Sequence, residues 1–243
     1  MVLEFFQVGV VAFLAIFQSF VGVGILFVGT PILLYFGYEL FDILSTLVPA
    51  SLALSVVNAI KYRDCIVLHA SVFAVPFGVG IGLFLAQFID KPALSILISV
   101  VLILLSYIGL SRKQGAYFES FMQGMFKKSL LYYSTLSLVH GLTNLGGGIL
   151  VWYSNNTISE KNAVRATIAM VYAILAASQL LFLAVFHSDK FQISSGIYAP
   201  IVAVSVFFAT DYFFCRINRE KYRSMIYASM MFIGGFVILR ELV

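Results

Sequence analysis

Charged residues are scarce in this sequence. Only 11% of its 243 residues are Asp, Glu, Lys or Arg, whereas 61% are hydrophobic. Soluble globular domains carry about 25% charged and roughly 45–50% apolar residues, so water could not cover the apolar surface of this chain. The scarcity excludes a soluble globular protein and indicates an integral membrane protein.

Cysteine and tryptophan are nearly absent, with two and one copies. Cys65 and Cys215 permit at most one disulfide. No His, Cys and carboxylate cluster has metal-ligand spacing, and no phosphate-binding loop or strand-anchored dinucleotide fingerprint occurs. We therefore expect no metal, no cofactor and no enzymatic activity. The net charge of +4 concerns the placement of loops, and we expect no nucleic-acid partner.

Long apolar runs fill most of the chain and are separated by short polar breaks. Open strand edges in lipid would leave backbone groups unpaired, so these runs are expected to be helices. At roughly 20 residues per transmembrane helix, the length leaves no room for a soluble catalytic domain. The runs are 5–36, 41–60, 65–89, 93–110, 129–153, 163–186, 193–214 and 224–239.

The chain divides into two similar halves. The segment Gly22–Leu26 aligns with Gly146–Leu150 at an offset of 124, with four of five positions identical. An offset of 121 pairs Thr46 with Thr167 and Asn58 with Gln179. The alternative is that such glycines only let membrane helices pack closely. The boundaries predicted from this alignment are a first repeat at 1–110, a cytoplasmic linker at 111–128 and a second repeat at 129–243, within one membrane domain.

The basic residues discriminate between two topologies, because cytoplasmic loops carry the excess of Lys and Arg. If all eight runs cross the membrane, the 15 basic residues divide eight against seven. If runs 5–36 and 129–153 each fold back, twelve share one face and only Lys91, Lys190 and Arg240 lie opposite. The second topology is therefore expected. Its weak point is that the first arm, about 5–20, is long enough to cross alone.

The predicted fold is all-α, a polytopic membrane helical bundle. It consists of two inverted repeats, each with one re-entrant helical hairpin and three transmembrane helices, as in many secondary transporters. A straight helix over run 5–36 would extend about 48 Å, well beyond a hydrocarbon core of roughly 30 Å. Both termini are expected on the extracytoplasmic side of the cell membrane.

The two glycine motifs resemble those of the sulfite exporter TauE/SafE family. The matching stretches are Gly22–Leu33 and Gly141–Leu150, and the resemblance in span layout covers nearly the whole chain. It implies movement of sulfite or organosulfonate-like anions. Val23 interrupts a glycine run that is unbroken in the family pattern, which implies a less open first tip or a different substrate.

The candidate substrate site lies at the glycine breaks. The N-terminus of each second half-helix offers free N–H groups and partial positive charge to an anion, and glycine lets a ligand approach the backbone. The alternative is that these are turn and packing residues. The candidates at the two tips are Ser19, Gly22, Gly24, Thr143, Asn144, Gly146, Gly147 and Gly148.

Other polar residues lie inside the apolar helices. Thr46, Thr167, Asn58 and Gln179 line the same cavity in one interpretation, and bond to their own backbone or a neighbouring helix in the other. His140 is a candidate for proton-linked transport because histidine titrates near neutral pH, with a hydrogen-bonded structural histidine as the alternative. Arg165 is expected at the cytoplasmic rim, with contact to an anion as the alternative.

The function predicted from these features is secondary transport of a small anion by alternating access. The expected partners are that anion and the lipid bilayer of the cell membrane. The alternative is a channel, or a packing or assembly protein that transports no sulfur anion. The oligomeric state stays open, with a homodimer as one option.

Overall fold

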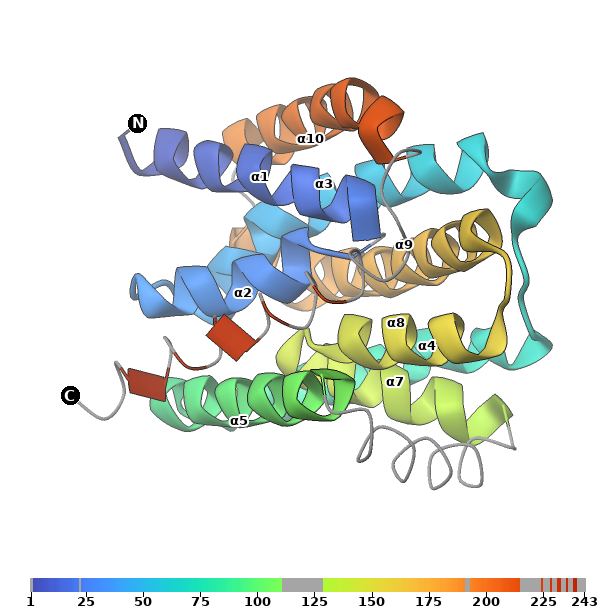
Figure 1. The fold of residues 1–243 in the computed structure, drawn as a ribbon. Helices are drawn as coiled ribbons and strands as arrows, with labels where there is room; N and C mark the ends of the chain where they lie inside the picture. The colour runs from blue at the N-terminus through green and yellow to red at the C-terminus, as the bar shows by residue number, and fades with distance from the viewer. Residues whose placement is uncertain are drawn as a thin grey trace.

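The computed structural model describes residues 2–21, 23–110, 129–190 and 193–214, with isolated positions between 224 and 239. All long elements in these ranges are α-helices (Figure 1). The predicted linker 111–128 and most of run 224–239 lie outside the described residues. The helices are α1 Val2–Val21, α2 Ile25–Tyr35, α3 Leu40–Lys61, α4 Val75–Ala86, α5 Lys91–Leu110, α7 Ser129–Thr143, α8 Gly146–Thr157, α9 Lys161–Phe186 and α10 Ile193–Phe214.

Both glycine-broken runs fold back on themselves. A Cβ built on Gly24 would lie 2.7 Å from the backbone nitrogen of Gln18, and one built on Gly29 would lie 2.7 Å from Leu14 Cδ1. The chain therefore reverses after α1, and α2 returns antiparallel along it (Figure 1). In the second run, Tyr132 of α7 stacks on Tyr153 of α8 with ring centroids 3.9 Å apart. The pairs α1–α2 and α7–α8 are called hairpin 1 and hairpin 2 below.

The loops gather at two ends of the bundle. At one end the Val67 N–H donates to Thr167 Oγ1 at 2.9 Å, beside Lys61, Arg63 and Lys161, and we call it the basic end. At the opposite end Phe41 stacks on His187 with ring centroids 4.0 Å apart. Consequently α3 and α9 run antiparallel to each other.

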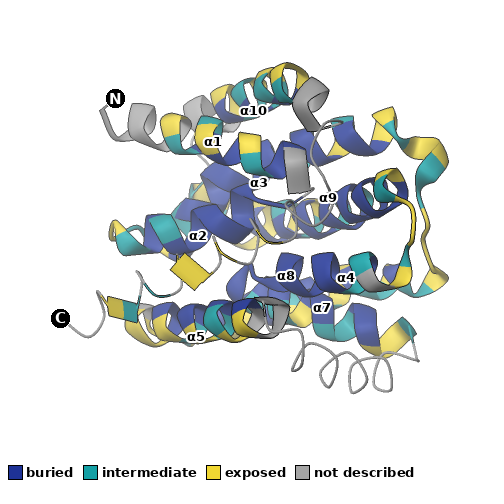
Figure 2. Ribbon diagram, viewed as in Figure 1, coloured by how far each residue is buried: buried dark blue, intermediate teal, exposed yellow. Residues whose placement is uncertain are grey.

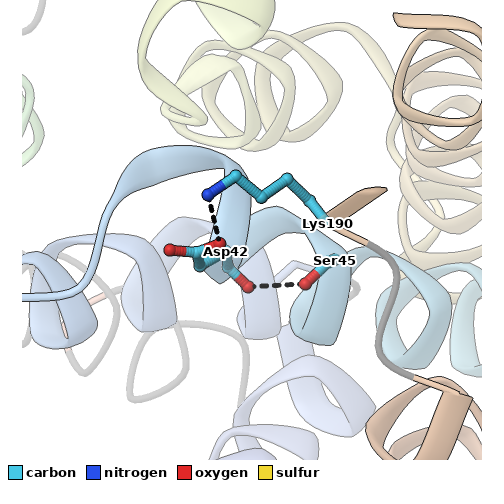
Figure 3. A network of polar contacts seen from close by, with 3 residues as sticks. All are labelled: Asp42, Ser45 and Lys190. Carbon is cyan, nitrogen blue, oxygen red and sulfur yellow. Dashed lines mark hydrogen bonds and ion pairs between the residues drawn. The ribbon is translucent and has the colours of Figure 1, made fainter. Parts of the chain in front are cut away.

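An ion pair connects two segments at the opposite end of the bundle. Figure 3 shows Lys190 reaching from the turn after α9 to Asp42 in the first turn of α3, where its Nζ lies 3.2 Å from Oδ1. The Ser45 hydroxyl donates to the carbonyl oxygen of Asp42 at 2.8 Å. The ion pair connects the start of α3 to the turn after α9, and the Ser45 hydrogen bond lies within α3.

The helix packing has a repeated pattern. α3 and α9 pack together, while α4 packs on α7 of the other half and α10 packs on α1. α10 also contacts α3, and α4 contacts α9. The buried residues concentrate on α3, α8 and α9, whereas α5 and α10 show many exposed residues (Figure 2).

The exposed surface is strongly apolar. Beginning in the turn before α4, large side chains face outward at helical spacing, among them Phe73 at 80% and Phe77 at 76% exposure, followed by Ile81, Phe84 and Phe88. A contiguous apolar surface of this kind marks an interaction with lipid or protein. By length and composition, α3 and α9 qualify as membrane-crossing helices among the residues described, with mean hydropathy 1.9 and 2.3.

Run 65–89 departs from the expected continuous helix. Residues 66–69 have no helical structure, Ala70–Ala74 forms a 3₁₀ turn, and α4 has only 12 residues. Two features explain why run 65–89 is not one continuous helix. The Val67 N–H is bound by Thr167, and Pro76 in the first turn of α4 has no N–H to donate, which favours a helix start. At about 18 Å, α4 is shorter than the apolar core of a bilayer.

Candidate functional site

The two hairpin tips meet in the middle of the bundle. A Cβ built on Gly147 would lie 3.3 Å from the Val23 Cβ and 3.1 Å from Tyr172 Cε2. Tyr172 is residue 12 of the 26 in α9, a helix about 39 Å long. Val23 and Tyr172 are both buried, at 2% and 0% exposure. The two tips therefore touch about halfway along α9, the longest of the described helices, and no gap separates them in this conformation.

Gln18 supports the tip of hairpin 1. Its Oε1 accepts the N–H of Ile25, the first residue of α2, at 3.0 Å, and its Nε2 donates to the Ser51 carbonyl at 3.0 Å and to Ser55 Oγ at 2.9 Å. Its amide thus caps one half-helix and ties it to α3. The sequence analysis missed Gln18, although a fully polar side chain just before a glycine break in an apolar run is the signal that could have identified it.

Asn144 organises the tip of hairpin 2. Its backbone has a φ of 61°, a left-handed conformation that Asn adopts more readily than most residues. Its Nδ2 donates to Thr30 Oγ1 of α2 at 2.8 Å, and its Oδ1 accepts from Gln179 Nε2 of α9 at 2.5 Å. Asn144 therefore joins both hairpins and α9, and the sequence analysis did not identify Thr30.

The hydroxyls of Ser19 and Thr143 occupy equivalent positions in the two halves. Ser19 Oγ donates to the Ala15 carbonyl at 2.7 Å, and Thr143 Oγ1 donates to the Val139 carbonyl at 2.7 Å. Each bond returns to the backbone four residues earlier, a pattern usual for Ser and Thr in membrane helices. In this conformation both hydroxyl protons are directed to their own helices.

The remaining candidates are distributed over the bundle. Gly24, Gly146 and Gly148 are buried, and Gly22 lies outside the described residues. Thr46 and Thr167 are buried too, but Thr46 lies in the part of α3 nearer the opposite end, while Thr167 binds Val67 at the basic end. The structure does not bring these two threonines together.

A cavity of about 250 Å³ opens near Thr167 at the basic end. It lies between the open arms of hairpin 2, the start of α9 and the loop before α4. Its polar groups are mainly hydroxyls, and no Lys, Arg, Asp or Glu is among its lining residues. These residues are Val67, Leu68, His69, Ser129, Tyr132, Tyr133, Leu150, Tyr153, Ser154, Thr157, Ile158 and Thr167.

Arg165 is buried rather than placed at the rim. It is 1% exposed, and its guanidinium donates to the Ser19 carbonyl at 2.6 Å and to the Tyr62 hydroxyl at 3.3 Å. The guanidinium carbon also lies 5.0 Å from the Tyr62 ring centroid and 5.5 Å from that of Phe207. The expectation of a rim position is wrong because the end of α1 offers a carbonyl that attracts a cation.

His140 lies next to the tip of hairpin 2 and is fully buried. A Cβ on Gly146 would lie 2.5 Å from its Cβ, and its ring meets Tyr172 edge to face at 5.3 Å. No partner of either ring nitrogen, of the Tyr172 hydroxyl or of Gln179 Oε1 meets full hydrogen-bonding geometry among the described residues, although the Gln179 side chain approaches the His140 ring and the Phe27 backbone approaches the Tyr172 hydroxyl. Buried polar atoms are normally paired, so these groups mark a place for a polar guest.

A model of the family described as Sulfite exporter TauE/SafE matches residues 7–237. The chain belongs to this family. Membership indicates a role in membrane transport for this TauE/SafE protein, in agreement with the helical fold and the apolar surface of its described residues. Curated proteins and solved structures give no significant match to the chain.

Proposed function

We propose that this TauE/SafE protein is a secondary transporter that moves a small sulfur-containing anion, sulfite or an organosulfonate, across the cell membrane. The observation that carries the proposal is the contact of the two hairpin tips, Gly147 on Val23, halfway along α9. Each tip begins a half-helix, α2 or α8, whose N-terminal N–H groups favour an anion. The proposed site comprises the tip residues together with Thr46 and Thr167.

The proposed membrane topology is a pair of inverted repeats with re-entrant hairpins. It is supported by the packing of six helices, because exchanging α1 with α7, α3 with α9 and α4 with α10 leaves the set of contacting pairs among these six unchanged. The antiparallel course of α3 and α9 supports it as well, since equivalent helices of inverted repeats run in opposite directions. On this topology Lys61, Arg63 and Lys161 are cytoplasmic.

The proposed transport cycle is alternating access. Its support is the cavity at the basic end, which enters between the arms of hairpin 2 while the tips beyond it are in contact. An anion entering from the cytoplasm reaches hydroxyls first and the half-helix N-termini only after the tips separate. The lining is rich in hydroxyls and contains no Lys, Arg, Asp or Glu, which suits an anion that must also leave again.

Flux into liposomes tests the transport proposal. We expect saturable uptake of labelled sulfite by the reconstituted wild type and its loss in Gly147→Leu, because leucine cannot fit between Val23 and Tyr172. Gly80→Leu is the matched control, since a Cβ at Gly80 meets nothing within 4 Å. Wild-type liposomes with no saturable flux, or large ohmic currents instead of it, would support the packing or channel alternatives.

Cysteine labelling tests the topology. In a Cys65→Ser, Cys215→Ser background, an impermeant maleimide applied to intact cells should label Asp90→Cys, in the loop between α4 and α5, and spare Ser159→Cys, in the loop between α8 and α9. Permeabilised cells should label both. Labelling of Ser159→Cys in intact cells contradicts the topology.

A further inference from the structure

Three buried polar side chains surround the tip of hairpin 2. His140 of α7 is joined there by Tyr172 and Gln179 of α9, and all three are 0% exposed. The Gln179 amide nitrogen donates to Asn144 Oδ1. Gln179 Oε1, the Tyr172 hydroxyl and both His140 nitrogens have no partner in full hydrogen-bonding geometry among the described residues, and the Gln179 side chain approaches the His140 ring. The cluster therefore places the titratable His140 ring beside a hydrogen-bond acceptor, Gln179 Oε1, and a hydroxyl that can donate, that of Tyr172.

The surroundings of His140 contain no fixed charge. The sequences of α2, α4, α7 and α8 contain no Asp, Glu, Lys or Arg, and α5 has only Lys91, at its first residue. On α9 the charged residues are Lys161 and Arg165, and Arg165 is about 10 Å along the helix from Tyr172. None of these six helices contains a carboxylate that would neutralise a protonated His140.

The other titratable groups facing this region are tyrosines. Tyr172 lies against the ring of His140 itself. Tyr132 and Tyr133 lie about two turns nearer the basic end on α7, where Tyr132 stacks on Tyr153 of α8. None of them carries charge at neutral pH, so the charge of the cluster depends on His140 and on whatever binds there.

A single buried charge is costly unless an opposite charge accompanies it. Arg165 is engaged at hairpin 1, where it donates to the Ser19 carbonyl and the Tyr62 hydroxyl, and it lies about 10 Å along α9 from Tyr172. Among the described residues, an anion at the tip of hairpin 2 would therefore be in contact with no other cation than a protonated His140, and an imidazolium alone would have no carboxylate. Together they stabilise each other, and such coupling is reciprocal: the anion favours the proton and the proton favours the anion. This mutual dependence is what co-transport requires.

We infer that His140 carries a coupling proton, so that the protein co-transports one proton with each anion. This inference rests on the proposed function. A proton from the solvent binds the lone pair of the neutral ring as the anion binds at the tips, and both return to the solvent on the far side, with no bond of the anion changed. Gln179 Oε1 accepts one imidazolium N–H, and the other N–H and the Tyr172 hydroxyl face the anion.

Proton movement in proteoliposomes tests the inference. Labelled sulfite and an internal pH dye are followed with the voltage clamped by potassium and valinomycin. For wild type we expect an added sulfite gradient to move protons inward, and a pH gradient of one unit to raise sulfite accumulation about tenfold. His140→Gln should slow sulfite exchange at equal pH, because it alters a group that faces the anion, and should lose completely the accumulation driven by the pH gradient.

The controls separate this inference from the proposed function. His187→Gln, at the opposite end, should behave as wild type, and Tyr172→Phe provides a second variant that removes one hydroxyl from the cluster and should weaken coupling. Sulfite carries a titratable proton of its own, so the same measurements are made with a labelled organosulfonate, which is fully ionised at neutral pH. Proton movement and pH-driven accumulation of the sulfonate that persist in His140→Gln would overturn the inference while leaving the transporter standing. Wild-type flux without proton movement would do the same. Absence of any saturable wild-type flux would overturn both.

Discussion

Val23 of one hairpin tip fills the space in front of Gly147 of the other. The Val23 Cβ and Cγ1 would both lie 3.3 Å from a Cβ on Gly147, and Tyr172 Cε2 would lie 3.1 Å from it. Val23 interrupts the glycine run of the first motif, and the missing side chain of Gly147 accommodates it. The closure of the two tips thus depends on one valine and one glycine.

Gly147→Ala should slow transport and destabilise the protein, because its methyl forces Val23 and Tyr172 apart. Overpacking of this size costs about 1–3 kcal/mol. Adding Val23→Gly should restore part of the flux by removing the opposed side chain. Thermal unfolding in detergent and sulfite flux measure both effects. Gly80→Ala should change neither, and a double variant as impaired as Gly147→Ala would show that the two residues do not oppose each other.

Gln18→Leu should destabilise the protein by about 1–3 kcal/mol, the cost of leaving buried groups unsatisfied. The substitution removes the cap on the Ile25 N–H and the bonds to Ser51 and Ser55. The melting temperature should therefore fall, and hairpin 1 should become more susceptible to proteolysis. Gln87→Leu, on an exposed residue after α4, is the control, and an equal fall in both variants argues against a special role of Gln18.

Arg165→Lys should loosen hairpin 1 although it keeps the charge. Lysine has one ammonium in place of the planar fork, so it cannot reach both the Ser19 carbonyl and the Tyr62 hydroxyl while lying between two rings. We expect a loss of about 1–3 kcal/mol in stability and reduced sulfite flux. Arg63→Lys should have little effect because its ion pair with Asp64 is exposed. An unchanged melting temperature in Arg165→Lys would show that the contacts at Ser19 are dispensable.

The Lys190–Asp42 pair should stabilise the protein only below strongly alkaline pH. A hydrogen bond to Asp42, assisted by the charge of that carboxylate, raises the pKa of Lys190. A raised pKa means that the contribution is complete below the unfolded-state pKa and is lost as the pH rises through the folded-state value. The melting-temperature difference between wild type and Lys190→Gln should therefore vanish at high pH. Asp42→Asn should remove the same step, and a difference that grows with pH contradicts the assignment.

Much of the architecture follows from the sequence. Scarce charge and long apolar runs specify membrane helices, and the ends of α3, α5, α9 and α10 lie within two residues of the expected runs. The first glycine motif lies between α1, which ends at Val21, and α2, which begins at Ile25. The second motif, 146–148, forms the first turn of α8, directly after the turn at 144–145. Such signals depend on neighbours in the chain, so the sequence alone reveals them.

Contacts between distant segments required the tertiary structure. The residues around Arg165 in the sequence do not indicate that its partner is the Ser19 carbonyl, 146 residues away. The residues around Gln18 likewise do not indicate that its amide binds Ser51 and Ser55. The break in run 65–89 likewise depends on Thr167, which binds the Val67 N–H from another helix.

The sequence by itself determined that this chain is a membrane protein of two glycine-broken halves, with Asn144 and Gly147 at one tip. Only the tertiary structure decided that the tips touch through Val23 and Gly147, and that His140, Tyr172 and Gln179 form a buried cluster beside them. Periodicity and composition fix which face of each helix is apolar. The burial and pairing of a polar side chain depend on which helices meet, and that is set by packing across the whole bundle.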